Sequence, residues 1–79
     1  MNAKIEVKVA ENLDELAAQY RDRSVLRDWK DQLEHEISLA RANDASDYVL
    51  DRQQYVIEAL AGRIDLISEA ILAGISALR

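Results

Sequence analysis

Two tyrosines and two arginines are the residues of this sequence whose types and spacing are best suited to binding chemistry. Tyr48, Arg52 and Tyr55 follow at positions i, i+4 and i+7, and Arg63 lies close to the same line if the segment is helical. Tyrosine and arginine dominate interface hot spots because they combine buried area with directional hydrogen bonds. The same set could stack a base and hold a phosphate. We therefore predict a site for a protein partner or, as an alternative, for a small nucleotide held between subunits.

A structural role for these four residues is a further alternative. In that interpretation both arginines pair with carboxylates of the neighbouring helix, such as Glu34 or Glu36, and the tyrosines complete the core. Both interpretations follow from the same spacing.

Few other residues offer chemistry. His35 is the single histidine, and Asp31 one turn before it could supply a second metal ligand, but no third ligand is suitably spaced. The chain has no cysteine nucleophile and no glycine-rich phosphate loop, and its serines have no plausible base nearby. We expect no enzymatic activity, no metal site and no cofactor.

The composition limits the class of protein. A chain of 79 residues forms one domain at most, and such a domain is marginal alone, so that oligomerisation is the remaining way to stabilise it in the absence of cysteine. The hydrophobic share of 49%, with 32% charged residues and no proline, predicts an all-α fold. A net charge of -5 disfavours generic binding to nucleic acid.

The sequence also carries expectations about location. Met1 to Val9 alternates charged and apolar residues, which is not the pattern of a signal peptide. The longest uncharged run, Ala70 to Leu78, is far shorter than the ~20 residues that a membrane span needs. We expect a cytoplasmic protein with no membrane contact.

The element that must position the tyrosines and arginines is a long helix at about 45–78. Its apolar surface is wider than the single stripe that a surface helix buries, so burying this surface requires neighbours on two sides of the helix. One neighbour can come from the same chain, and we expect the second to come from another copy. The predicted oligomer interface consists of Val49, Val56, Leu60, Ile64, Ile67, Ile71, Ile75 and Leu78.

Two shorter helices are expected before the long one. Asn12 can cap a first helix at about 12–21, and a second apolar stripe predicts a helix at about 25–42. The two stripes differ in phase by about a third of a turn, so we predict a break at Arg21–Ser24. Trp29 lies in the middle of the second stripe and is expected in the core.

A turn at 43–47 should join the second helix to the third as an antiparallel hairpin, with Asp44 or Ser46 as the next N-cap. The long helix then outruns its partner by about 13 residues, and the short helix could cover part of the excess. The whole chain, residues 1–79, is one helical domain with an N-terminal arm at 1–11, helices within 12–42 and the long helix at 48–79.

The N-terminal arm alternates strictly over residues 3–9. Ile5, Val7 and Val9 fall on one face, and lysines and a glutamate on the other, which is the period of a half-buried strand. Either this strand pairs with its symmetry mate in a dimer, or it is an extended arm that lies on the helices.

The order of elements from Lys4 to Ala42 resembles the ribbon-helix-helix family of dimeric DNA-binding proteins. The matching pieces are Lys4–Val9, Leu13–Ala17 and Arg23–Leu26. The resemblance implies paired strands in a DNA groove, with Lys4, Glu6 and Lys8 as readers and the amides after Arg23 and Ser24 on a phosphate.

These observations favour a small non-enzymatic homo-oligomer that acts by occupying a protein partner. It would be an inhibitor, adaptor or assembly factor of the size often encoded by phages and other mobile elements. One alternative is a ribbon-helix-helix-like DNA-binding antitoxin or repressor. The other is a nucleotide-sequestering protein with an intersubunit pocket at Tyr48, Arg52, Tyr55 and Arg63.

Overall fold

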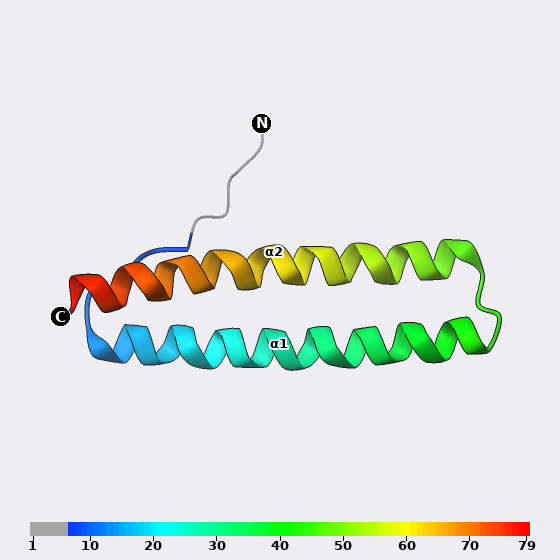
Figure 1. Cartoon of the computed structure of the whole chain (residues 1–79), viewed down its shortest axis with the longest axis horizontal. Coiled ribbons are helices and arrows are strands. Elements are labelled where there is room, and N and C mark those ends of the chain that lie inside the picture. Colours follow the sequence, from blue (N-terminus) through cyan, green and yellow to red (C-terminus); the bar gives the residue numbers. More distant parts are fainter. Residues whose placement is uncertain (1–6) are drawn as a thin grey trace, which may run out of the picture.

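The protein is a hairpin of two long helices. The computed structural model describes residues 7–79, in which α1 (Leu13–Ala42) and α2 (Asp47–Ala77) run antiparallel and side by side (Figure 1). The described part of the chain contains no strand, so the predicted all-α class and the helical hairpin are confirmed. Neither helix holds a stretch that is both apolar and long enough to span a membrane, as far as residues 7–79 show.

Helix α1 is continuous, and the predicted break at Arg21–Ser24 is wrong. Consequently there are no separate helices at 12–21 and 25–42. The stripe changes phase because polar residues occupy positions that face α2, namely Gln19, Arg23 and Lys30, all half-buried. Long polar side chains can cover apolar surface with their stems while their heads reach water. The predicted excess of the last helix is also absent, because the helices have 30 and 31 residues.

Both helix starts are capped by side chains. Asn12 Oδ1 accepts a hydrogen bond from the Glu15 backbone N–H at 2.9 Å, as predicted for the first helix. Of the two candidates for the second cap, Ser46 takes the role and accepts from the Val49 N–H. The turn between the helices closes through Asp44, whose φ of 56° lies in the left-handed region that aspartate tolerates.

The two helices pack along a heptad seam. Its members recur at alternating spacings of three and four residues, which is the pattern of a coiled coil, and all of them are buried or half-buried. On α1 the seam is Leu16, Gln19, Arg23, Leu26, Lys30, Leu33, Ile37 and Ala40. On α2 it is Leu50, Gln53, Ile57, Leu60, Ile64, Ile67, Ile71 and Gly74, followed by Leu78.

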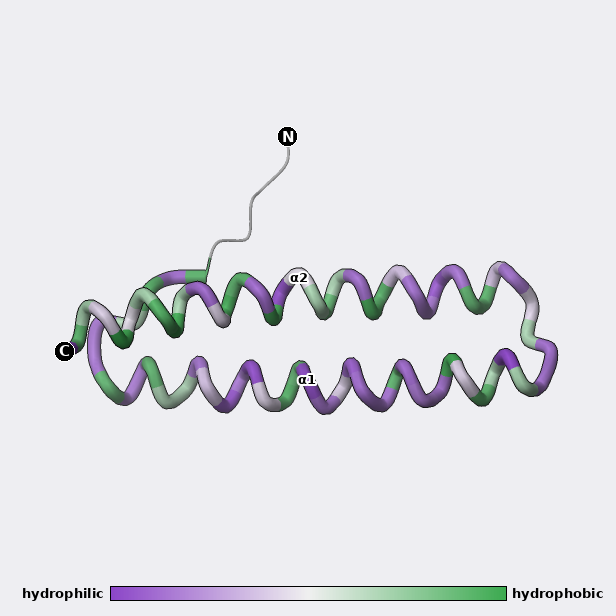
Figure 2. The backbone as a smooth tube through the Cα atoms, in the orientation of Figure 1, coloured by the Kyte–Doolittle hydropathy of each residue, from purple (hydrophilic) through white to green (hydrophobic). Residues whose placement is uncertain are grey.

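The best-buried part of the molecule lies at the end of the hairpin away from the turn. This terminal cluster consists of Ala10, Leu16, Ile67 and Ile71, with Val7, Leu26, Ile75 and Leu78 packed against it. Figure 2 shows the contrast between the helices, since α2 carries most of the hydrophobic residues near this end and α1 is largely hydrophilic. Gly74 allows α1 and the preceding residues to approach α2 closely here. A Cβ at this position would stand 3.2 Å from Leu16 Cδ1 and 3.6 Å from Ala10 Cβ.

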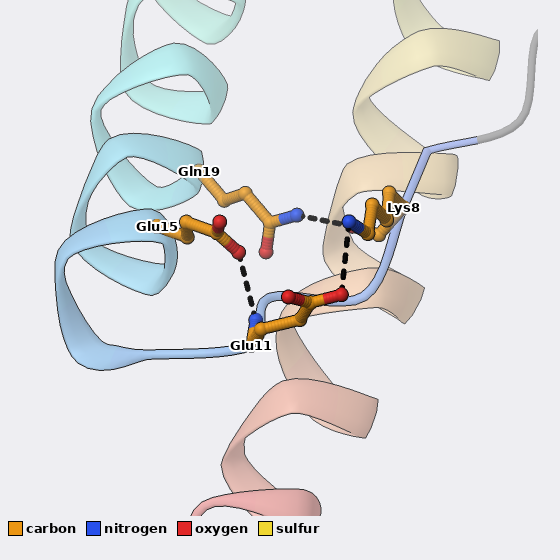
Figure 3. Close-up of polar contacts among 4 residues, drawn as sticks. All are labelled: Lys8, Glu11, Glu15 and Gln19. Carbon is orange, nitrogen blue, oxygen red and sulfur yellow. Dashed lines mark hydrogen bonds and ion pairs between the residues drawn. The ribbon is translucent and has the colours of Figure 1, made fainter.

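Residues 7–12 form a short arm that folds back on the helices. Gln19 Nε2 donates to the Lys8 carbonyl at 2.6 Å, and the Glu11 N–H donates to Glu15 Oε2 at 2.8 Å (Figure 3). Lys8 also pairs with Glu11 at 2.9 Å, and this carboxylate raises the pKa of Lys8 above its ordinary value. Residues 7–9 are neither helix nor strand. The rest of the predicted strand, residues 3–6, lies outside the described residues.

Candidate interaction face

One broad face of the hairpin carries exposed apolar side chains from both helices. Trp29 lines two shallow hollows between the helices, one with Val25 and Arg63 and the other with Val56. We call this surface the Trp29 face. From α1 it comprises Asp22, Val25, Trp29, Gln32 and Glu36, and from α2 Val49, Arg52, Val56, Leu60 and Arg63.

Trp29 is the most conspicuous residue of this face. Its side chain is 55% exposed, so the predicted place in the core is wrong. The reason is its register, since Trp29 stands between the seam residues Leu26 and Lys30 on the outer flank of the seam. An exposed indole beside exposed valines is the composition of an interface centre and not of an ordinary solvated surface.

The opposite face of the hairpin is charged. A hollow there is lined by Arg27, Lys30, Asp31, Ala61, Ile64 and Asp65. Lys30 Nζ pairs with Glu34 Oε1 at 2.6 Å on this side, and the carboxylate raises the pKa of Lys30. The exposed tryptophan and valines therefore lie on the Trp29 face, and this hollow on the opposite face is lined mostly by charged side chains.

Arg63 is the half-buried cation of the Trp29 face. Its Nη1 atom is buried and has no hydrogen-bond partner among the described residues. The predicted pairing of the arginines with Glu34 or Glu36 is not seen, because the ion pairs within residues 7–79 are Lys8–Glu11 and Lys30–Glu34. A buried guanidinium nitrogen without an acceptor is costly, so the polar contacts of Arg63 within the hairpin are incomplete.

Tyr48, Arg52 and Tyr55 come together near the turn, as their spacing predicts. The two tyrosines are 69% and 73% exposed, and with Asp51 and Val56 the set lines a shallow hollow of about 630 Å³. Arg52 Nη1 donates to Tyr48 Oη at 3.2 Å, and its guanidinium lies 5.7 Å from the ring centroid. Arg63 is about 16 Å further along α2. It shares the face of Arg52 but not the hollow.

The predicted oligomer interface divides into covered and open residues. The hairpin itself buries Ile64, Ile67 and Ile71. Leu60, Ile75 and Leu78 are half-buried, and Val49 and Val56 are exposed. Sequence reasoning missed the α1 half of the open surface, Val25 and Trp29, and the signal for it was the heptad seam that leaves both residues on its flank.

Two further features bear on the alternatives. His35 is exposed, and no group of three or more metal-ligating side chains occurs within residues 7–79. The turn that the ribbon-helix-helix resemblance needs at Arg23 and Ser24 lies inside continuous α1, where backbone amides are bonded within the helix.

Comparison of the chain with protein-family models, with curated proteins and with solved structures finds no match.

Proposed function

We propose that this chain is a non-enzymatic interaction protein that self-associates and occupies a protein partner, as an inhibitor, adaptor or assembly factor. The observation that carries the proposal is the exposed Trp29 at the centre of an apolar face. Small helical proteins without cysteine gain most of their missing stability by association.

A hairpin of two helices buries only the seam between them. Each helix keeps a second apolar flank, formed by Val25 and Trp29 on α1 and by Val49 and Val56 on α2. Burial of apolar surface contributes about 25 cal/mol per Å², and an exposed tryptophan and three valines offer several hundred Å² between two copies. These exposed apolar side chains support the proposal that two copies associate through this face.

The partner is proposed to bind at the turn end, where Tyr48 and Tyr55 flank Arg52. Exposed tyrosine and arginine on a rigid helix give large contact area at low entropic cost. A cytoplasmic location and an origin in a phage or another mobile element complete the proposal. The location rests on the alternation of charged and apolar residues over 1–9, and the origin rests on the size of the chain.

Light scattering after size exclusion tests the self-association. We expect a mass above that of one chain at micromolar concentration, and we expect Trp29→Glu to give a monomer whose helical circular dichroism is retained. Leu72→Glu is the matched control, because Leu72 is 67% exposed and lies about 160° around α2 from Val56. A monomeric native protein would refute the proposal.

Nucleotide binding is a second candidate, favoured by the contact of Arg52 with the Tyr48 ring in an open hollow. A thermal shift with a panel of nucleotides that Arg52→Ala removes would support it. The absence of any thermal shift would contradict nucleotide binding.

A further inference from the structure

We infer that a second copy of the chain docks on the Trp29 face, with a two-fold axis that runs parallel to the helices. This inference rests on the proposed self-association and specifies its geometry.

The chain itself already covers one end of the face. Val49, Val56, Arg63 and Ala70 follow each other at intervals of seven residues and therefore lie on one line of α2. The arm closes over Ala70, which is buried, and leaves Val49 and Val56 exposed. Val49 and Val56 thus lie on the same line of α2 as this covered residue, with Arg63 between them and Ala70.

Symmetry leaves two ways to pack this face on a copy of itself. A two-fold axis between two stacked layers must lie in their common plane, either along the helices or across them. With the axis along the helices, α1 lies on α2 of the partner subunit, and facing residues stand at the same level of the bundle. With the axis across the helices and through the middle of the hairpin, α1 lies on α1 of the partner subunit.

The charges of the face distinguish the two arrangements. The charged residues that α1 contributes to it are Asp22 and Glu36, whereas α2 contributes Arg52 and Arg63, with Asp51 beside Arg52 in the hollow near the turn. Asp22 and Glu36 each stand seven residues from Trp29, so the axis across the helices would set acid against acid. The axis along the helices sets α1 acids against α2 arginines instead.

The arrangement with the axis along the helices also brings these residues to matching levels. Glu36 and Arg52 stand at nearly equal distances from the turn, so Glu36 faces the partner subunit's Arg52. Val25, Trp29 and Arg63 border one hollow, so the partner subunit's Trp29 comes to lie against Arg63. Asp22 borders the same hollow in each chain, so the partner subunit's Asp22 comes to stand near the Arg63 guanidinium.

The resulting bundle has four helices in which every adjacent pair is antiparallel, an arrangement that helix dipoles favour. Both turns lie at one end of the bundle. The two copies of the Tyr48–Arg52–Tyr55 hollow therefore stand at the same end, where a partner can engage both at once.

Cysteine cross-linking tests the geometry, since the chain has no cysteine of its own. Glu36→Cys and Arg52→Cys variants are unfolded, mixed, refolded together and mildly oxidised. We expect a disulfide-linked heterodimer from this mixture and none from a mixture of Glu36→Cys with Asp22→Cys. Asp31→Cys, on the charged face, should give no link with any of them.

The reverse result, a link between positions 22 and 36, would overturn the inferred axis while leaving the proposed self-association intact. A native protein that is monomeric by light scattering would overturn both. An oligomer in which neither mixture links would show that another face is used, and would also overturn the inference.

Charge reversal gives an independent readout. Glu36→Arg should raise the dimer dissociation constant by roughly tenfold, and adding Arg52→Glu in the same chain should restore it. Asp31→Arg, the same change on the opposite face, should leave the dissociation constant unchanged. A doubly reversed chain as weak as the single variant would contradict the pairing of Glu36 with the partner subunit's Arg52.

Discussion

Trp29 and Arg63 show how single residues report on what a fold lacks. A solvent-exposed indole at the middle of a helix and a buried guanidinium nitrogen without an acceptor are both unfavourable for an isolated hairpin. Both side chains border the same hollow, so a copy docked there covers the indole and sets its own Asp22 near the guanidinium. The sequence pointed to Arg63 as a binding residue, but it placed Trp29 in the core. An apolar stripe does not distinguish a seam position from its flank when the seam itself holds lysine and arginine.

The two glycines of α2 make a matched pair for a stability prediction. A Cβ at Gly62 would meet no atom within 4 Å, whereas at Gly74 it would meet Leu16 Cδ1 at 3.2 Å. Gly62→Ala should therefore raise the free energy of unfolding by about 0.5–1 kcal/mol, through helix propensity alone. Gly74→Ala should raise the free energy of unfolding by less, because Leu16 must move. Gly74→Leu should lower it by about 1–3 kcal/mol through overpacking. Urea denaturation measures all three. A gain at Gly74 equal to that at Gly62 would show that Leu16 does not pack closely against Gly74.

At the scale of the elements, the hairpin, its turn and its caps were predictable, whereas the continuity of α1 was not. Asn12 and Ser46 are residue types with a strong preference for N-caps, and the polar run that begins at Asn43 is typical of a turn. The phase shift near Arg23 was a misleading signal. It reflected polar residues that had been inserted into the seam, and a change of residue type leaves the backbone helical.

The polar seam of α1 yields a prediction for that helix. Lys30 occupies a half-buried seam position opposite isoleucine and leucine, and its ion pair with Glu34 is exposed enough to contribute little. Lys30→Leu should therefore raise the free energy of unfolding by about 1 kcal/mol. It should also reduce the preference for one oligomer, because polar seam residues disfavour competing registers. Thermal denaturation and light scattering check the two effects. Glu34→Ala, which removes only the ion pair, is the control and should change stability by less than about 0.5 kcal/mol.

At the scale of the whole molecule, the sequence predicted a helical chain with more apolar surface than it can cover. The sequence predicted that the long helix needs neighbours on two sides. Helix α1 is the neighbour on one side of α2, and the other apolar side of α2 forms part of the Trp29 face. The position of that face could not be derived beforehand, because it depends on α1 running unbroken alongside α2. Residues such as Ile67 and Ile71, expected between subunits, instead close the terminal cluster within one chain.

Association predicts that the stability of the whole molecule depends on concentration. If two copies share the Trp29 face, unfolding is coupled to dissociation, and the Tm should rise as the protein concentration is raised from 1 to 100 μM, by several degrees. Differential scanning fluorimetry over that range measures the change. The Trp29→Glu variant should show a lower Tm that no longer depends on concentration, and a concentration-independent native Tm would contradict a dimer.

The location of the terminal cluster also determines how the chain can fold. Contacts near the turn close short loops at little entropic cost, but the seam there holds Gln53 beside few buried residues. The best-buried residues are far apart in the sequence, such as Leu16 and Ile71 of the terminal cluster. A hairpin that zips from its turn gains little until it is nearly complete, so we expect a late transition state and cooperative kinetics. Native-state hydrogen exchange should then be slowest around Ile67 and Ile71, at the far end from the turn.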